Sequence, residues 1–441
     1  MTVTATRLGS SPITLDWSNF IRVPTTTSTG AKAIAPDSQT YLHEWTEGWE
    51  KLRGRFMRNE IGFYNAPIDP ELSQIEATEA LAAQILNSKQ FTDCLFLGIG
   101  GSALGPMSLL SSLQEHCKTK MRFHICDNPD PIDWKATLGR LSPDHTLVCA
   151  VTKSGTTFET VAQLLIAMEW LGKNRLKSHL IAITDPAKGD MKAFATQEGL
   201  ATLHISAPIG GRFSVFSPVG LFPAALAGLS LSEFMLGAKQ VRDYIEKTPL
   251  EKNPIFIIGQ EMIRQANQRS IHVCMPYSTR LRLIGDWFVQ MWGESLGKDG
   301  KGFTPLAALG ATDQHSILQL LRDGPDDKIT MFLTVDQVED EVKIPKLPGP
   351  TSYASFKLLE GHTLQELLLT EYRATSLVLT KGGRPNLTLR VDKLDERSLG
   401  ALFFTFSFLT AMTGTLMNVN PFDQPGVEEG KIYTREALMN S

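Results

Sequence analysis

Between residues 94 and 184, short apolar runs of strand length alternate with segments of helical periodicity. This order is typical of a parallel sheet, because parallel neighbours are joined by a long crossover that is usually a helix. The expected strands are residues 94–97, 123–126, 146–151 and 180–184, and the clearest crossover helix is residues 158–171. The alternation predicts an α/β fold built on doubly wound parallel sheets, each flanked by helices.

The 441 residues of the chain exceed the size of one ordinary hydrophobic core, so we expect two such units. The second half repeats the pattern less clearly, with expected strands at residues 255–258, 271–274, 329–335 and 377–379 and expected helices at residues 283–296 and 399–417. Before the first strand, residues 1–45 are rich in Thr, Ser and Pro and are expected to be irregular, and helices are expected at residues 42–57 and 71–86. The predicted division is an N-terminal arm and helix at 1–60, a first domain at 61–235 and a second domain with a C-terminal helical segment at 236–441.

Composition excludes several classes of protein. The net charge is −4 with both signs interspersed, which disfavours a nucleic-acid surface but allows a local basic pocket. The five cysteines form no CxxC pair and no His/Cys cluster, so we expect reduced thiols and no zinc site. The N-terminus lacks the pattern of a signal peptide, and the apolar residues 401–417 are short for a membrane span and read as a buried core helix. We therefore expect a cytoplasmic protein without nucleic-acid or membrane partners.

A glycine-rich turn, GIGGSALG at residues 98–105, follows the first expected strand. Its glycine spacing differs from that of a dinucleotide fingerprint, and no GK[ST] follows as in a P-loop. Closely spaced glycines still allow backbone amides to approach an anion. From the residues alone, a tight structural turn and a ligand-binding turn remain equally good interpretations.

The loop TKSGTT at residues 152–157 joins the third expected strand to a helix. Four hydroxyls, one cation and one glycine stand in six residues, at a helix N-terminus that offers free amides and the positive end of its dipole. Helix capping is the ordinary role of such hydroxyls, but capping needs only one of them. The loop therefore favours phosphate binding.

Together these motifs resemble the phosphoglucose isomerase family. GIGGSALGP and VTKSGTTFET look like its paired sugar-phosphate segments. Four further motifs follow in the family's order: GGRFSVFSPVG at 210–220, WGESLGKDGKG at 292–302, GATDQH at 310–315 and NPFDQPGVEEGK at 420–431. The resemblance covers most of residues 95–431 and is with the short bacterial forms. It implies two sugar-isomerase (SIS) domains and a homodimer with shared active sites.

The activity implied by the resemblance is interconversion of glucose 6-phosphate and fructose 6-phosphate through ring opening and a cis-enediolate, in glycolysis and gluconeogenesis. No cofactor or metal is implied. The motifs imply that Glu294 moves the proton, that His315 and Lys431 assist ring opening, and that Arg212 stabilises the enediolate. The implied substrate-binding residues are Gly101, Ser102, Thr152, Lys153, Ser154, Gly155, Thr156, Thr157, Gln290 and Gln424.

Two other functions are alternatives to this one. A dual phosphoglucose and phosphomannose isomerase belongs to the same reaction class and is not separated from the main hypothesis by the sequence. A sugar-phosphate sensor would keep the hydroxyl loop without needing Glu294, His315, Arg212 and Lys431 together, and all four are present. The chain departs from the usual pattern at Gly155 and Phe158, which puts fine substrate preference in doubt without removing a catalytic group.

Overall fold

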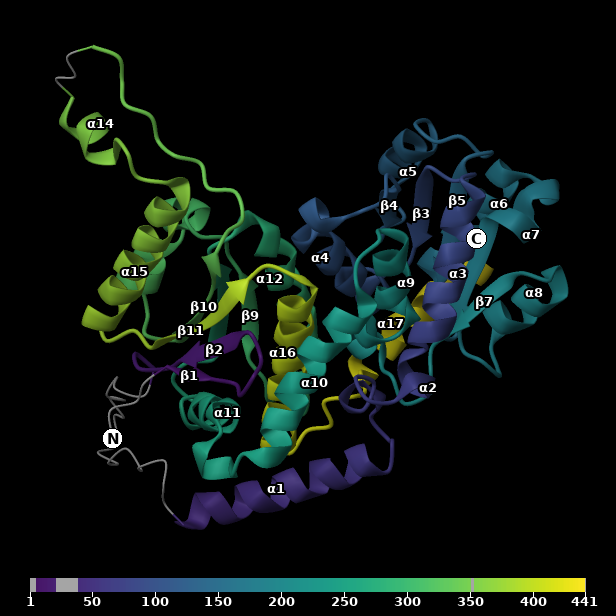
Figure 1. Ribbon diagram of the computed structural model, residues 1–441. Coiled ribbons are helices and arrows are strands. Elements are labelled where there is room, and N and C mark those ends of the chain that lie inside the picture. Colours follow the sequence, from purple (N-terminus) through teal and green to yellow (C-terminus); the bar gives the residue numbers. More distant parts are fainter. Residues whose placement is uncertain (1–4, 21–38, 350–352, 441) are drawn as a thin grey trace.

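The computed structural model describes residues 5–20, 39–349 and 353–440, and its strands form two sheets (Figure 1). The first sheet has five parallel strands in the order β4-β3-β5-β6-β7. Their bounds are β3 Asp93–Leu97, β4 Arg122–Cys126, β5 Thr146–Val151, β6 Leu180–Thr184 and β7 Ala201–His204. The four strands predicted in this part of the sequence are confirmed, and β7 adds a fifth.

The second sheet has six strands in the order β1-β2-β11-β10-β8-β9. Their bounds are β1 Thr6–Arg7, β2 Ile13–Asp16, β8 Ile271–Pro276, β9 Thr304–Ala307, β10 Lys328–Gln337 and β11 Asn386–Lys393. The four strands β8 to β11 are parallel, whereas β1 and β2 add an antiparallel edge. The doubly wound α/β fold is confirmed.

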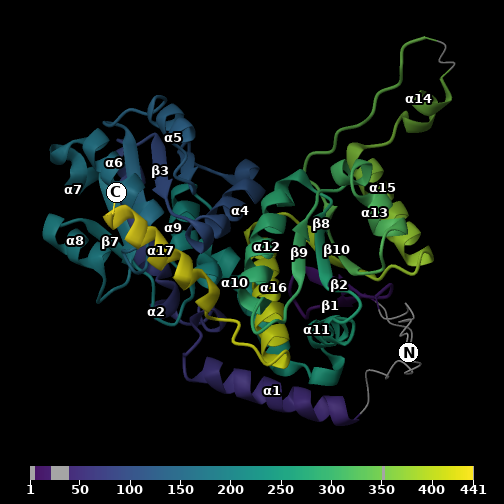
Figure 2. The same ribbon diagram turned by 180° about the vertical axis from the view of Figure 1, so that it is seen from behind.

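Helices cover both faces of each sheet (Figures 1 and 2). Their bounds are α1 Gln39–Met57, α2 Pro70–Ser73, α3 Ile75–Ser88, α4 Leu104–Ser112, α5 Pro131–Leu138, α6 Phe158–Leu171, α7 Leu176–His179, α8 Asp190–Glu198, α9 Pro218–Leu226, α10 Leu231–Lys247, α11 Pro254–Arg264, α12 Arg282–Leu296, α13 Leu318–Asp323, α14 Ala354–Leu359, α15 Leu364–Lys381, α16 Glu396–Leu416 and α17 Glu428–Met439. In the first sheet, α3 and α9 pack on one face and α5 to α8 on the other. In the second, α13 and α15 pack on one face and α10, α11, α12 and α16 on the other.

Two strand predictions in the second half are wrong. Residues 255–258 lie in α11, because Asn253 caps its first turn and Pro254 occupies its first position, which starts a helix. Residues 377–379 lie in α15, which a capping box of Thr363 and Glu366 begins. The helix expected at 71–86 is divided into α2 and α3 by Gln74, whose φ is 52°.

The expectation that residues 1–45 are irregular is also wrong where the structure describes them. β2 pairs with β11, and β1 pairs with β2, so the N-terminus extends the second sheet. Ile13 and Leu15 alternate with half-buried residues and enter the core, a pattern too short to identify a strand by itself. Residues 21–38 lie outside the described residues.

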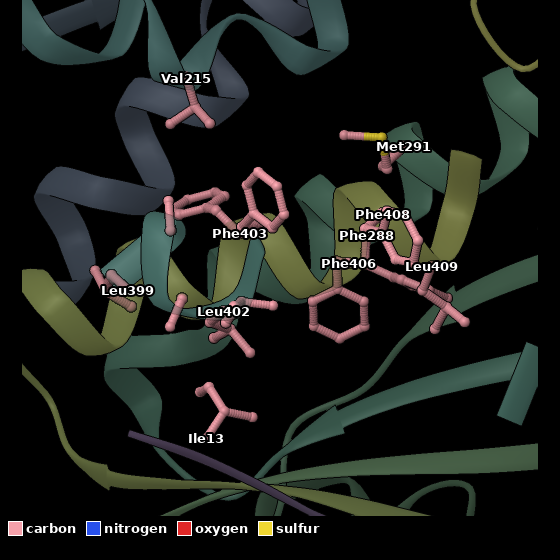
Figure 3. Packing of buried hydrophobic residues seen from close by; sticks show 14 of the residues in the cluster. Ile13, Val215, Phe288, Met291, Leu399, Leu402, Phe403, Phe406, Phe408 and Leu409 are labelled. Atoms are coloured by element: carbon pink, nitrogen blue, oxygen red, sulfur yellow. The ribbon is translucent and has the colours of Figure 1, made fainter. Parts of the chain in front are cut away.

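Helix α16 forms the centre of the largest core, as expected for the apolar residues 401–417. It is long and apolar enough to cross a membrane, but 89% of its most apolar window is buried inside the protein. Figure 3 shows Phe403, Phe406 and Leu409 of this helix among side chains of neighbouring elements, including Phe288 and Met291 of α12. The helix therefore holds α12, which carries the predicted site residues Gln290 and Glu294, against the rest of the core.

The five cysteines are free thiols, as the sequence predicted. Cys94, Cys149 and Cys274 are buried in the strands of the two sheets. Burial raises the pKa of the Cys94 thiol to about 12 and that of Cys126 to about 11. These thiols are therefore protonated near neutral pH, and their role is packing.

Candidate active site

The site begins at the carboxyl ends of two neighbouring strands. Leu97 of β3 pairs with Ala150 of β5, so the glycine turn 98–105 and the hydroxyl loop 152–157 leave the sheet side by side. Open parallel sheets bind ligands at this edge. The two loops that the sequence singled out are therefore brought together by the topology.

Close backbone contacts tie the glycine turn to two other elements. A Cβ atom on Gly101 would lie 2.3 Å from the carbonyl carbon of Gly211, so only glycine fits there. Gly100 has φ +58°, and a Cβ on it would lie 3.0 Å from Nε2 of Gln290 on α12. The turn, the 3₁₀ segment Gly211–Phe216 and α12 thus converge at one place, as the assignment of Gly101 and Gln290 to one site requires.

Arg212 is buried at this junction, with only 4% of its surface exposed. Its Nε donates to Oγ of Ser295 at 2.6 Å, and its Nη1 donates to Oε1 of Gln424 at 3.1 Å. Its Nη2 donates to the carbonyls of Pro421 at 2.6 Å and Asp423 at 3.0 Å. Burial lowers the pKa of Arg212, which the nearby carboxylates of Glu294 and Asp423 oppose. Four hydrogen bonds fix the guanidinium in a single orientation.

Glu294 of α12 faces this guanidinium. Its Oε2 lies 3.5 Å from Nη1 of Arg212 and accepts a bond from Nε2 of Gln290 at 3.4 Å. The Glu294 side chain is 27% exposed, and its Oε1 makes no hydrogen bond with any residue that the structure describes. One carboxylate oxygen is therefore held while the other remains open to a ligand. Oε1 of Gln290 is buried and also lacks a partner among the described residues.

The hydroxyl side chains of the loop 152–157 do not cap helix α6. Thr157 is the N-cap residue of α6, but its side chain makes no capping bond and lies 3.2 Å from Oγ1 of Thr152 instead. Oγ1 of Thr152 accepts from the Gly155 amide, and Oγ of Ser154 accepts from the amide and hydroxyl of Thr156. Ser154 and Thr156 are exposed. The capping interpretation of Thr157 is thereby excluded, and the N-terminus of a 14-residue helix stays open.

Lys153 and Gly155 have structural tasks within this loop. Nζ of Lys153 donates to the carbonyls of Ala207 at 2.6 Å and Ile209 at 3.0 Å, and burial lowers its pKa. The ammonium thus holds the segment that leads into Arg212. Gly155 has φ +75°, and a Cβ on it would lie 2.2 Å from the amide nitrogen of Met191, so the loop requires glycine.

Two other predicted residues, His315 and Lys431, stand apart from the Arg212–Glu294 pair, whereas Ser102 follows Gly101 in the turn that contacts the Arg212 backbone. His315 ends the 3₁₀ segment Thr312–His315 and is exposed, and no contact among the described residues joins it to Glu294 or Arg212. Lys431 lies on the exposed helix α17 and donates to Glu428 at 2.7 Å. Ser102 is half-buried at the end of the glycine turn, and its hydroxyl makes no hydrogen bond in the described part of the chain.

Sequence reasoning missed several groups that build the site. Ser295 and Lys298 lie inside the motif that supplied Glu294, and Asp423 lies inside the motif that supplied Gln424. Their positions inside these motifs could have identified them as candidate site residues. The backbone carbonyls of Pro421 and Asp423 could not be identified as acceptors from the sequence, because every residue carries the same carbonyl group.

Comparison with known proteins shows the family of the chain and relates its fold to a solved structure. The model of the family "Phosphoglucose isomerase" matches residues 74–440. The glucose-6-phosphate isomerase of Carboxydothermus hydrogenoformans is 37% identical over 91% of this chain and 90% of its own length. That of Rubrobacter xylanophilus is 40% identical over 86% of this chain and 90% of its own length. A crystal structure of a glucose-6-phosphate isomerase from Chlamydia trachomatis shares the fold, with a TM-score of 0.81 at 21% identity over 99% of this chain and 89% of that one.

Proposed function

The chain belongs to the phosphoglucose isomerase family, and from this premise we propose that it interconverts glucose 6-phosphate and fructose 6-phosphate, a step of glycolysis and gluconeogenesis. The observation that carries the proposal is the pairing of Glu294 with a buried, fully hydrogen-bonded Arg212 beside an open hydroxyl loop. This arrangement offers a phosphate anchor at the carboxyl edge of the first sheet, together with the fixed positive charge of Arg212 and a base on α12, which packs against the second sheet.

The phosphate of the substrate would bind at the loop 152–157. The amides at the N-terminus of α6 and the positive end of its dipole attract an anion. The exposed hydroxyls of Ser154 and Thr156 add neutral donors, and Ser102 enters from the neighbouring turn. Lys153 contributes by holding the loop through carbonyls, with its charge close enough to favour an anion nearby.

Proton transfer would use the free Oε1 of Glu294. Isomerisation requires a base that removes a proton from the carbon beside the carbonyl and returns it to the neighbouring carbon. Negative charge then develops on the two oxygens of the enediolate, and a preorganised cation at that point stabilises the transition state. Arg212 is such a cation, because its orientation is set before substrate arrives.

Ring opening needs further groups, for which we propose His315 and Lys431. A histidine exchanges protons near neutral pH and can serve the ring oxygen. In this subunit both side chains are exposed and neither contacts Arg212 or Glu294 in the described residues. We propose that His315 reaches the site of a partner subunit in a homodimer, and that Lys431 on α17 assists ring opening.

Exposed apolar surface supports the homodimer. Residues 338–349 and 353–363 extend away from the body of the protein and carry α14 near their outer end (Figures 1 and 2). Tyr353, Phe356 and Leu358 on this arm are 61%, 52% and 73% exposed. A monomeric protein rarely exposes such a group of large apolar side chains, whereas a second copy would bury them. We further propose a cytoplasmic location and a division into SIS domains near residue 235.

The experiment that tests the activity measures conversion of fructose 6-phosphate to glucose 6-phosphate by purified, metal-stripped protein. Turnover supports the proposal. Binding of fructose 6-phosphate without turnover would favour the sugar-phosphate sensor. Mannose 6-phosphate, assayed beside fructose 6-phosphate, separates the dual isomerase from the specific one.

Shared active sites are tested by mixing two inactive variants. In a shared-site dimer of Glu294→Gln with His315→Ala, one site combines both lesions and the other has neither. About a quarter of wild-type activity is expected after subunit exchange of equal amounts, because half of the dimers are mixed and each restores one of two sites. No recovery, with exchange verified by differently tagged subunits, would show that His315 acts within its own subunit.

A further inference from the structure

Lys298 joins the helix of Glu294 to the loop that follows α16. It stands just past the C-terminus of α12, four residues after Glu294, and only 9% of its side chain is exposed. Its Nζ donates to the carbonyls of Asn420 and Asp423, the latter at 2.6 Å, and lies 2.9 Å from Oδ1 of Asp423. A buried lysine ammonium can donate three hydrogen bonds, and here all three go to one turn.

The same turn receives the guanidinium of Arg212. The carbonyl of Asp423 accepts from Nζ of Lys298 and from Nη2 of Arg212 at 3.0 Å, so one oxygen is shared by two cations. The Asp423 carboxylate offsets the mutual repulsion of these two cations. Burial alone would raise the pKa of Asp423, but the contacts with Lys298, Asn420 and Arg212 outweigh burial and lower this pKa below its ordinary value. Nδ2 of Asn420 donates to Oδ2 of Asp423 at 2.6 Å and closes the turn on itself.

These contacts make the turn 420–424 a bridge between two groups of the site. Lys298, two residues past the end of α12 at Leu296, binds the turn on one side, and Arg212 binds it on the other, partly through Gln424 of the turn itself. Without the ammonium, the turn would keep its bonds to Arg212 but would lose its attachment to α12. The guanidinium would keep its bond to Ser295 on α12, but Gln424 and the carbonyls of residues 421 and 423, which orient its other two nitrogens, could shift relative to Glu294.

We propose that Lys298 is a positioning residue for the isomerisation, holding Arg212 and Gln424 in register with Glu294 through the backbone carbonyls of residues 420 and 423. The proposal rests on the proposed function. Lys298 does not contact the hydroxyl loop 152–157 in the described structure, so anchoring of phosphate is independent of it. Loss of Lys298 should therefore lower kcat and change KM little.

The test compares Lys298→Met and Lys298→Gln with wild type. Displacement of a catalytic group by about 1 Å can cost roughly 10²-fold in rate, so kcat of Lys298→Met should fall about 10- to 100-fold with KM for fructose 6-phosphate within about threefold. The side-chain amide of Lys298→Gln can donate to the same carbonyls. The fall in log kcat of this variant should therefore be at most about two thirds of the fall in Lys298→Met. Equal kcat in wild type and Lys298→Met would overturn the proposal, as would a rise in KM with kcat unchanged.

Lys301→Met is the matched control. Nζ of Lys301 donates to the carbonyl of Met417 at 2.9 Å, at the start of the same loop but outside the turn that binds Arg212. Its kcat should stay within about twofold of wild type, and an equal loss in both variants would show a general effect of loosening the loop. If Lys298→Met does not fold, the comparison of Lys298→Gln with Lys301→Met decides.

Hydrogen–deuterium exchange keeps this test separate from the proposed function. Amides in the peptide 418–426 should exchange faster in Lys298→Met than in Lys301→Met, whatever the wild-type protein catalyses. Unchanged exchange of this peptide would overturn the positioning role. A wild type without turnover, together with faster exchange in Lys298→Met, would reject the isomerase function and leave the Lys298 bridge established as a structural contact.

Discussion

The Arg212 guanidinium lies 3.5 Å from Oε2 of Glu294, while each of its nitrogens is also bonded to a fixed acceptor. This pairing gives the two residues separate tasks. A cation that could swing toward the carboxylate would neutralise the base, whereas one held by four other bonds remains available for charge that develops on the substrate. In the proposed mechanism, the free Oε1 is the proton acceptor.

The first prediction concerns Glu294→Gln. The amide keeps the shape and can still contact Arg212, but it cannot accept the proton. Because a positioned base commonly contributes about 10²- to 10⁴-fold, kcat should fall by that factor while KM changes little. The matched control is Glu79→Gln, which alters an exposed glutamate of α3 and should leave turnover unchanged. A fully active Glu294→Gln would remove Glu294 from the mechanism.

The second prediction concerns Arg212→Lys. A lysine retains one positive charge, but its three donors on a flexible stem cannot reproduce the planar fork that bonds Ser295, Gln424 and two carbonyls. Loss of one preorganised donor to a developing oxyanion costs roughly 10²- to 10³-fold, so kcat should fall by at least about 10²-fold. Arg58→Lys, on a surface arginine paired with Glu60, serves as the control. Similar kcat values in the two variants would show that charge alone is enough at position 212.

Four of the five strands of the first sheet could be predicted, because each of these apolar runs ends in a loop with strong turn chemistry, whereas β7 was missed. The run 255–258 misled because its residues also form the buried face of α11, and periodicity cannot separate a short strand from part of a buried helix. The decisive signals were Asn253 and Pro254 just before it. Conversely, β9 contains Pro305 and is largely exposed at the sheet edge, so nothing in its sequence marks a strand.

The site residues could be located only through motifs, and their interactions could not be predicted at all. Arg212, Glu294 and Gln424 come from three distant segments, and their contact depends on how α12 packs against α16 and the loop after it. For Lys153, the motif suggested a contact that the structure does not have. Its place in a phosphate loop suggested contact with an anion, whereas its ammonium is bonded to two carbonyls.

The third prediction concerns Gly155→Ala. An alanine at position 155 has two separate free-energy costs. One is its φ of +75°, and the other is the 2.2 Å distance from its Cβ to the amide nitrogen of Met191. Gly383→Ala isolates the first cost, because Gly383 has φ +69° and open space around it. The left-handed conformation should cost about 1–2 kcal/mol of unfolding free energy in both variants. Only Gly155→Ala should also displace the hydroxyl loop and raise KM for fructose 6-phosphate at least about tenfold. Equal KM values in the two variants would separate the loop from phosphate binding.

The fourth prediction concerns acid stability and His272, a buried histidine that contacts α12. The indole N–H of Trp292 donates to its Nδ1 at 3.2 Å, its ring stacks on Phe303, and its Nε2 has no partner among the described residues. Burial lowers the pKa of His272 to about 3, whereas the unfolded chain binds that proton near pH 6.5. The folded state therefore holds fewer protons than the unfolded state between these two values. His272 makes the unfolding free energy fall as the pH falls through this window, by up to about 1.4 kcal/mol per pH unit, and adds no pH dependence above it.

His272→Gln isolates this contribution from that of the carboxylates. A glutamine side chain is neutral at every pH and its carbonyl oxygen can accept from the Trp292 indole, so the variant should keep the hydrogen bond without the titration. Urea unfolding of wild type and variant at pH 7.5, 5.5 and 4.5 would measure the difference. The wild type should lose about 1 kcal/mol per pH unit more than the variant between pH 5.5 and 4.5, since the unfolded histidine is almost fully protonated there. Parallel curves for the two proteins would mean that His272 takes up its proton without unfolding, and that the space around Nε2 admits water or a compensating acceptor.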